Sequence, residues 1–290
     1  MMQRASDGAE LRAIVRSLRA HGAGRVAFVP TMGALHDGHL ALVKTAREHA
    51  DAVVVSIFVN PLQFGAGEDF SRYPRQIERD AALLESIGAD LLFLPNVASL
   101  FPHGQEAQSR VEVPVLSDIL CGASRPGHFV GVTTIVSKLF NLVQADLAVF
   151  GEKDFQQLAI IRRMVADLNF PLEIIGQPTT RETDGLAMSS RNAYLSDDER
   201  QRAPALYATL RLMAEQLRQR HHMGRSDIER LEAEGRAALL VSGFMPDYVA
   251  IRRADDLSEP DEGVGDENLV ILAAARLGQT RLIDNIRVST

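Results

Sequence analysis

A short apolar run leads into a glycine-containing loop and then into a polar helix start, where the sequence reads Val26-Ala27-Phe28-Val29-Pro30-Thr31-Met32-Gly33-Ala34-Leu35-His36-Asp37-Gly38-His39. The apolar run is typical of a buried strand, and Pro30, which has no N–H to give to a sheet, predicts that the strand stops there. Gly33 permits a close backbone approach, and we expect a helix to begin near Gly38 and to run toward His49. A strand, a loop and a helix in this order form the first part of a parallel α/β sheet.

The same alternation of strand-like and helix-like segments continues over the first two-thirds of the chain. Residues 53–59 are apolar on both faces and rich in β-branched side chains, which is typical of a strand inside a parallel sheet. Further strands are expected at 91–94, 147–150 and 172–175, and helices at 11–18 (with Asp7 and Glu10 placed like a capping box), 74–88, 129–143 and 155–168. The alternation predicts a Rossmann-like α/β fold, a doubly wound parallel sheet with right-handed crossovers.

The pattern changes after about residue 180. Two charged helices are expected at 197–220 and 226–241, and three closely spaced strands at 248–252, 269–275 and 281–286. Helices followed by strands predict a smaller α+β domain. We therefore expect a Rossmann-like domain over residues 1–180 and a C-terminal α+β lid domain over residues 181–290.

Composition excludes several classes of protein. The 290 residues include 46% hydrophobic and 24% charged residues, which is ordinary for a globular chain, and no apolar run approaches the ~20 residues of a membrane span. The net charge of −7 disfavours general binding of nucleic acid, although a local basic pocket could still hold a small anion. The single cysteine, Cys121, is expected to be a small packed side chain, and it excludes an internal disulfide. Without a signal-peptide pattern at the start, we expect a cytoplasmic location.

The two histidines at the expected helix start are the first candidate for chemistry. His36 and His39 are three residues apart, so both rings can lie on one side of the first turn, where unpaired N–H groups favour phosphate. There they could donate hydrogen bonds to phosphate oxygens as charge develops. Two surface or capping histidines are the structural alternative, and a metal site is the weakest, because no third ligand and no H-E-x-x-H motif accompany the pair. No P-loop and no G-x-G-x-x-G motif occurs.

Three further loops follow expected strands and carry polar side chains. Gln63 offers a donor and an acceptor to a substrate, or else stabilises its own loop. Lys153 could neutralise a phosphate and Asp154 could contact a ribose or a magnesium ion, although a helix cap beside a solvated lysine is the simpler interpretation. Two hydroxyls and a guanidinium at residues 189–191 suit phosphates, while a serine-rich turn is the alternative.

These loops carry a resemblance to a known family. A strand followed by His-x-Gly-His at a helix start resembles the nucleotidylyltransferase superfamily. The longer string from Pro30 to His39 resembles the pantoate–β-alanine ligases (pantothenate synthetases), and three more blocks fit that family in order, at residues 58–65, 151–158 and 184–192. The resemblance spans residues 30–192, and the C-terminal third matches only in general character.

The resemblance implies an ATP-dependent ligase that joins pantoate to β-alanine through a pantoyl adenylate, releasing pyrophosphate and AMP. It implies catalytic roles for His36, His39, Lys153 and Arg191, and pantoate or β-alanine binding by Gln63 and Gln157. The same four catalytic residues are expected to bind ATP together with Met32, Gly33, Gly38, Gly151, Asp154, Thr180, Met188, Ser189 and Ser190. It also implies Mg²⁺ carried with the ATP phosphates, no metal site of the protein itself, small-molecule substrates only, and a homodimer.

Some points stay open at this stage. Thr180 stands where the family often has an aliphatic residue, but a backbone contact to adenine would tolerate that change. Phe155 lacks a hydroxyl that is common nearby in the family. Arg125 could reach a substrate anion or could serve the fold. Two other functions also fit the motifs: an adenylyl- or cytidylyltransferase acting on a phosphorylated acceptor, and a nucleotide sensor without catalysis.

Overall fold

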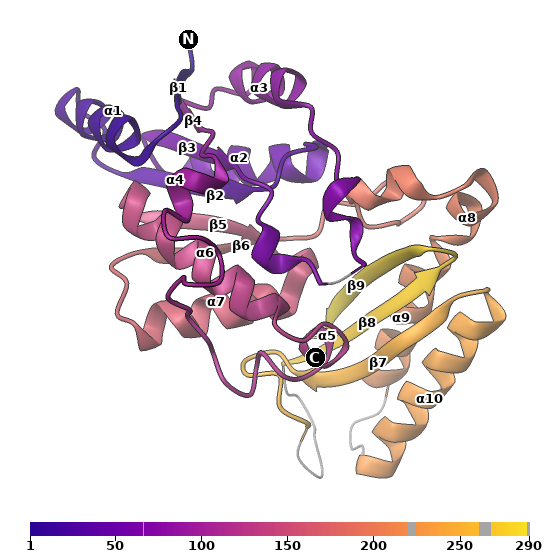
Figure 1. Cartoon of the computed structure of the whole chain (residues 1–290). Coiled ribbons are helices and arrows are strands. Elements are labelled where there is room, and N and C mark those ends of the chain that lie inside the picture. Colours follow the sequence, from indigo (N-terminus) through magenta and orange to yellow (C-terminus); the bar gives the residue numbers. More distant parts are fainter. Residues whose placement is uncertain (66, 220–223, 261–267, 289–290) are drawn as a thin grey trace. The chain divides into compact units, whose positions relative to one another are not determined.

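A computed structural model of the chain describes residues 1–65, 67–219, 224–260 and 268–288 (Figure 1). Internal contacts divide the chain into two compact units. The first comprises Met1–Glu152 and Ile160–Pro178, and the second comprises Lys153–Ala159 and Thr179–Thr290. That residues 1–180 and 181–290 act as separate domains, the second as a lid, stays a prediction. Among the described residues, no helix combines the length and the apolar character needed to cross a bilayer.

The first unit contains a six-stranded parallel sheet in the order β1-β4-β3-β2-β5-β6. Its strands are β1 Gln3–Ala5, β2 Val26–Thr31, β3 Ala52–Ile57, β4 Leu91–Phe93, β5 Leu147–Gly151 and β6 Glu173–Gln177. The predicted doubly wound sheet is therefore confirmed, with β1 as an edge strand that the sequence pattern did not indicate. The order reverses between β2 and β5, which is the switch point where open α/β sheets bind their ligands.

Helices cover both faces of this sheet. The longer ones are α1 Gly8–Ala20, α2 Asp37–His49, α3 Ile77–Ser86, α6 His128–Val143 and α7 Phe155–Asp167, and the short ones are α4 Val97–Leu100, α5 Cys121–Ser124, η1 Pro61–Gln63, η2 Asp69–Ser71 and η3 Glu152–Asp154. Of α7 and η3, the residues Lys153–Ala159 are assigned to the second unit. α2 and α3 share an apolar cluster with Val29 and Val55 of the central strands. On the other face, the ring of Phe28 lies 6.4 Å from that of Phe140 on α6, and α1 contacts α6. Burial on both faces is the reason that the central strands are continuously apolar.

The prediction that β2 ends at Pro30 is wrong, because the strand continues to Thr31. The even-numbered residues of β2 turn their backbone groups toward β5, as shown by the hydrogen bond from Asp146 N to Val26 O (2.8 Å). The pairing of β2 with β5 ends at Phe28, so at position 30 no neighbour remains to receive an N–H. Proline is tolerated in this central strand because the two strands part there.

The helix starts differ in detail from the expectations. Asp7 caps α1 by accepting hydrogen bonds from Ala9 N and Glu10 N (2.8 and 3.0 Å), but the Glu10 carboxylate accepts from Ser6 N (2.9 Å) rather than completing a capping box on Asp7. α3 begins at Ile77, three residues later than a start at Pro74 would give.

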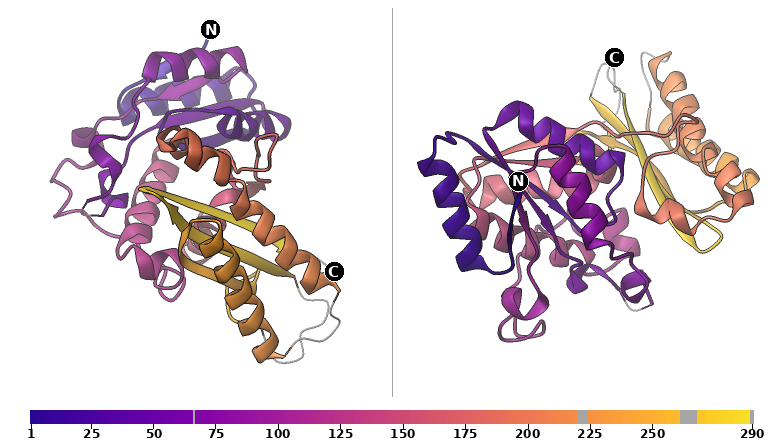
Figure 2. Two further views of the ribbon diagram at one scale, coloured as in Figure 1. Left: turned by 90° about the vertical axis from the view of Figure 1, so that its right-hand side faces the viewer. Right: turned by 90° about the horizontal axis from the view of Figure 1, so that it is seen from above.

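The second unit is an α+β fold, as predicted. Its strands β7 Met245–Arg253, β8 Leu269–Leu277 and β9 Thr280–Val288 form an antiparallel sheet, and its helices are η4 Ser190–Tyr194, α8 Asp197–Arg202, α9 Ala205–Arg218 and α10 Arg225–Val241. α9 and α10 pack on this sheet around Leu210, Met213 and Ile271, and Figure 2 shows these orange helices against the yellow strands. A single helix over 197–220 is wrong, because Pro204 cannot supply an N–H inside a helix and α9 starts anew after it. Arg220, its predicted end, lies outside the described residues.

Candidate active site

Two of the predicted loops leave the sheet side by side. β2 and β3 are paired up to Thr31 and Ile57, and Phe58 N donates to Thr31 O (3.0 Å) just beyond the last pair. The Thr31 hydroxyl also donates to Ser56 O (2.8 Å). The loop with the two histidines and the turn with Gln63 therefore start at the same carboxyl edge of the sheet.

The glycine loop after β2 has an unusual backbone, and a buried acid binds it. Gly33 and Ala34 have φ values of +81° and +52°, in the left-handed region where a residue with a Cβ is strained. The carboxylate of Asp80, on α3, accepts hydrogen bonds from Ala34 N (2.8 Å) and Leu35 N (2.9 Å) and is 1% exposed. No sequence motif singles out Asp80. Its signal was an acid on the apolar side of a predicted helix, four residues before Leu84.

The histidines form the first turn of α2. His36 is the N-cap, and its Nδ1 accepts from Gly38 N (3.2 Å), while Nδ1 of His39 accepts from His36 N (3.4 Å). The two imidazoles thus take the parts of both side chains of a capping box, and their ring centroids lie 4.1 Å apart. Because each Nδ1 accepts a hydrogen bond, each neutral ring carries its proton on Nε2. The capping alternative therefore holds for Nδ1, and Nε2–H is the group suited to a phosphate oxygen.

Gln63 lies in a short turn that other groups hold in place. The Asn60 side chain is 1% exposed and donates to Gln63 Oε1 (3.0 Å) and to Gly131 O of α6 (3.0 Å). A Cβ at Gly131 would lie 2.1 Å from Leu62 O, so only glycine allows α6 to approach this turn so closely. The amide of Gln63 is oriented through its oxygen, which suits a donor role for its nitrogen.

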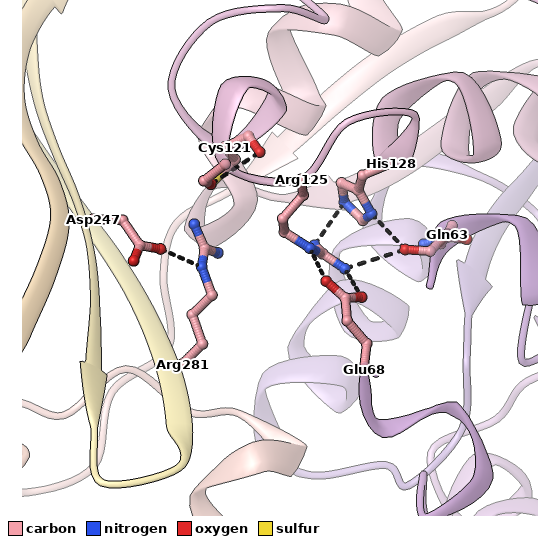
Figure 3. Close-up of polar contacts among 8 residues, drawn as sticks. Gln63, Glu68, Cys121, Arg125, His128, Asp247 and Arg281 are labelled. Atoms are coloured by element: carbon pink, nitrogen blue, oxygen red, sulfur yellow. Dashed lines mark hydrogen bonds and ion pairs between the residues drawn. The ribbon is translucent and has the colours of Figure 1, made fainter. Parts of the chain in front are cut away.

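An ionic network holds the backbone of the same turn (Figure 3). Nε and Nη2 of Arg125 contact the two oxygens of Glu68 (2.7 and 2.6 Å), and Nη2 also donates to Gln63 O (3.1 Å). Nη1 of Arg125 lies 3.0 Å from His128 Nε2, and His128 Nδ1 lies 2.8 Å from Gln63 O. Nε2 of His128 therefore accepts and its Nδ1–H donates. The anion that Arg125 contacts is thus Glu68, which favours a role in the fold.

The charge of Arg125 also fixes the protonation state of Glu68. Burial alone would raise the pKa of the Glu68 carboxyl, but the hydrogen bonds and positive charge of Arg125, helped by the backbone of Gly65, lower that pKa to about 2. Glu68 is therefore ionised throughout the neutral range.

In the second unit, Lys153 precedes α7 and its backbone is held by the last strand. Asn285 of β9 donates to Lys153 O (2.9 Å), and Lys153 Nζ lies 4.0 Å from Asp154 Oδ2. Gln157 is in the first turn of α7 and is half-buried. The β9 contact is one that the sequence analysis missed, since nothing in the pattern links these two segments.

The segment from Thr180 to Arg191 forms a narrow hairpin followed by a 3₁₀ turn. Met188 N donates to Thr180 O (3.0 Å), and the hydroxyl of Ser189 caps η4 by accepting from Arg191 N (3.3 Å). The hydroxyl of Ser189 therefore serves its own turn, as the structural alternative expected. Asn192, which was quoted only as part of a motif, donates to Ala187 O (3.1 Å) and holds the turn against the hairpin.

A buried ion pair joins this hairpin to β9. Both Nη atoms of Arg181 contact the carboxylate of Asp284 (2.6 and 2.9 Å), and the guanidinium lies 3.6 Å from the centre of the Tyr207 ring. Burial raises the pKa of Asp284, which is 3% exposed, while Arg181 and Lys153 oppose that rise. Neither member of the pair was singled out from the sequence.

The described residues contain no group of three or more His, Cys, Asp or Glu side chains that could hold a metal ion. The metal interpretation of His36 and His39 therefore lacks a third ligand in the described part of the chain. Cys121 is buried, as expected for a small packed side chain.

A doubly wound sheet with an N–H-rich helix start at its switch point defines the class of Rossmann-like nucleotide-binding α/β proteins. Within this class, residues 3–287 match the family described as pantoate-beta-alanine ligase, and the chain belongs to that family of enzymes. The resemblance drawn from four motifs is thus confirmed, and it extends over the C-terminal third.

Individual relatives agree with this assignment. The pantothenate synthetase of Pseudomonas entomophila (strain L48) is 58% identical over 277 residues, covering 96% of this chain and 94% of the relative. The structure of pantothenate synthetase from Thermus thermophilus has a TM-score of 0.90 at 48% identity, with all of both chains covered. The pantoate-beta-alanine ligase from Francisella tularensis, complexed with beta-gamma ATP and beta-alanine, has a TM-score of 0.80 at 34% identity and covers 100% of this chain and 99% of its own.

Proposed function

We propose that this chain condenses pantoate with β-alanine at the expense of ATP to give pantothenate. The observation that carries the proposal is the family match over residues 3–287, which includes the His36–His39 helix start at the switch point of the sheet. The relative from Francisella tularensis, whose structure holds beta-gamma ATP and beta-alanine, supports the same two substrates here.

The chemistry requires activation of a carboxylate, because a carboxylate does not react with an amine at neutral pH. An oxygen of pantoate attacks the α-phosphorus of ATP, the bond from that phosphorus to the bridging oxygen breaks, and pyrophosphate leaves. The amine of β-alanine then attacks the acyl carbon of the pantoyl adenylate, the bond from that carbon to the phosphate oxygen breaks, and AMP leaves as the nitrogen loses a proton. No covalent enzyme intermediate is needed, so the protein contributes positioning and charge stabilisation.

The histidine pair would act at the α-phosphate. His36 and His39 each take a backbone N–H on Nδ1, so each neutral ring can donate Nε2–H to the oxygens on which charge develops. Lys153 and Arg191 would neutralise the phosphates, with Lys153 held through its carbonyl by Asn285.

The remaining residues would bind the substrates. Gln63 and Gln157 would hold pantoate through hydrogen bonds to its hydroxyl and carboxylate. Backbone and side-chain contacts to ATP are proposed for Met32, Gly33, Gly38, Gly151, Asp154, Thr180, Met188, Ser189 and Ser190.

Three further expectations belong to the same proposal. Mg²⁺ would enter with ATP as part of the substrate, held mainly by phosphate oxygens. A homodimer and a cytoplasmic location are proposed from the family resemblance and from the single cysteine, respectively.

Exchange of radiolabelled pyrophosphate into ATP tests the first half-reaction. We expect exchange only when pantoate is present, and formation of AMP and pantothenate once β-alanine is added. Transfer of the nucleotide to a phosphorylated acceptor would instead favour an adenylyltransferase. Binding of ATP without any pantoate-dependent exchange would favour a nucleotide sensor, and either outcome would contradict the proposal.

A further inference from the structure

Asp80 is a buried carboxylate that lies outside every motif that defines the proposed reaction. It lies on α3 and is 1% exposed, and its two oxygens accept one hydrogen bond each, from Ala34 N (2.8 Å) and Leu35 N (2.9 Å). An ion removed from water is costly unless its oxygens are hydrogen-bonded, so these two N–H groups compensate for its burial. The acid and the loop therefore depend on each other.

The loop bound by Asp80 has a backbone that does not form easily by itself. Gly33 and Ala34 both have positive φ, and Ala34 carries a Cβ that disfavours this region. Strained residues of this kind persist only where surrounding contacts fix them. Asp80 supplies such contacts at Ala34 and at the next residue, Leu35, directly before the N-cap His36.

We propose that Asp80 is a positioning residue for the reaction, one that acts on the substrate only through His36 and His39. By fixing Ala34 and Leu35 it sets the direction from which His36 enters α2. That entry in turn gives Nδ1 of both imidazoles a backbone N–H and makes Nε2–H the donor proposed for the α-phosphate. This inference rests on the proposed function. The loss of rate expected on changing Asp80 follows from the rule that a displacement of about 1 Å in a reacting group can cost about 10²-fold in rate.

The opposite edge of the same sheet supplies a matched control. There the carboxylate of Asp90 accepts a hydrogen bond from Val53 N (2.8 Å), at the amino end of β3. It is also an aspartate that holds a backbone N–H of this sheet, and its ion pair with Arg47 (3.1 Å) is in the last turn of α2, at the other end of that helix from the histidines. Because the side chain of Asp90 is 32% exposed, this control tests the loss of a carboxylate–backbone contact in the sheet, and the free energy of unfolding of both variants is measured beside kcat.

The first test measures kinetics. Asp80→Asn keeps the size of the side chain but replaces one acceptor by a donor that faces an N–H. We expect kcat for pantoate-dependent pyrophosphate exchange to fall about 10- to 100-fold, with the KM for pantoate changed by less than about twofold because uniform binding is retained. Asp90→Asn should leave kcat within about twofold of the wild type. An unchanged kcat in Asp80→Asn, or equal losses in both variants, would overturn the inference. A wild-type protein without exchange would instead contradict the proposed function.

The second test reads the histidines directly and needs no turnover. In ¹⁵N-histidine-labelled protein the ring nitrogen shifts report which nitrogen carries the proton, and His36→Gln and His39→Gln variants assign the two rings. We expect both rings of the wild type as Nε2–H tautomers, and a mixture of tautomers in Asp80→Asn but not in Asp90→Asn. If Asp80→Asn does not fold, Asp80→Ser, which retains one acceptor, takes its place. Wild-type tautomers in a folded Asp80 variant would overturn the inference.

Discussion

The glycine loop of the first unit and the hairpin at residues 180–192 of the second are proposed to bind the same nucleotide, but they are held in place by different means. The glycine loop depends on backbone N–H groups that point at one buried carboxylate, Asp80. The hairpin depends on long cationic side chains, with Arg181 bound to Asp284 and Arg200 bound to Glu182 and Asp184.

The difference has a physical consequence. Backbone donors are fixed to the chain and lose little freedom when they are bound, so they can hold the histidines within the narrow tolerance that their proposed role at the α-phosphate requires. An arginine loses side-chain entropy when its flexible stem is fixed in an ion pair, and salt screens the pair where it is exposed. The contribution of such a pair to stability therefore depends on its burial. We therefore expect the loop to control rate and the hairpin to control stability.

The largest expected effect is at the buried ion pair of the hairpin. Arg181→Met leaves the carboxylate of Asp284 buried without its cation, and we expect the free energy of unfolding to fall by about 3–5 kcal/mol. Urea denaturation measures this change. The double variant Arg181→Met/Asp284→Leu should recover much of the loss, since no buried charge is then left. If the free energy of unfolding fell by less than about 1 kcal/mol in Arg181→Met, the hairpin would not control stability as we expect.

The next effect concerns rate. His39→Ala removes one donor proposed to act on the α-phosphate, and we expect kcat to fall by about 10²–10³. The free energy of unfolding should fall by only about 0.5–1.5 kcal/mol, because the hydrogen bond from His36 N to Nδ1 is lost as well. His49→Ala, at the other end of α2 and exposed, is the control and should keep full activity. An undiminished kcat in His39→Ala would remove the histidine from the mechanism.

A smaller effect is expected at the network around Gln63, where an ionic contact holds a turn of the first unit. Glu68→Gln should lower the free energy of unfolding at pH 7 by about 2 kcal/mol, because a charged hydrogen-bond pair with Arg125 is lost. The pKa of Glu68 is lowered to about 2 in the folded protein, so the wild type keeps this stabilisation above the usual glutamate pKa and loses it as the pH falls toward 2. The two proteins should therefore converge in stability between about pH 4.5 and pH 2. Equal pH profiles for the two proteins would show that this contact contributes nothing.

The smallest expected change in the free energy of unfolding is at Arg200, a more exposed cation that binds the same hairpin. Arg200→Met removes a guanidinium whose side chain is 33% exposed, and we expect a loss of only about 0.2–1 kcal/mol. Arg200 lowers the pKa of Asp184 through a hydrogen bond, but water and salt weaken such a contact at the surface. The difference from wild type should vanish in 1 M salt, whereas that of Arg181→Met should remain. A salt-independent loss at Arg200 would show that exposure does not distinguish the two pairs.

Much of the fold follows from local pattern. Strands buried on both faces must be apolar throughout, and helices that cover them must be amphipathic, so their alternation was visible along the chain. The strand end predicted at Pro30 was wrong because the proline's missing N–H matters only if a neighbouring strand is present at that position. The end of the pairing between β2 and β5 decides this, and no local pattern reports it.

The candidate site divides in the same way. His36, His39 and Gln63 were visible because they stand directly after strands, in motifs with a family resemblance. Asp80 was not, because its importance comes from contacts 45 and 46 residues away in the sequence. The pairing of Arg181 with Asp284 spans 103 residues and was equally hidden. A supporting residue can be identified only when the fold shows what it supports.

The close approach of α6 to the turn before Gln63 restricts how this enzyme could be redesigned. Even a methyl group at Gly131 would overlap Leu62 O, so the helix and the turn are in direct backbone contact. If this turn binds the acid, as we propose, a designer who wished to admit a bulkier one could not move the turn toward α6 without a clash at Gly131. A library aimed at this turn would therefore have to vary both segments together.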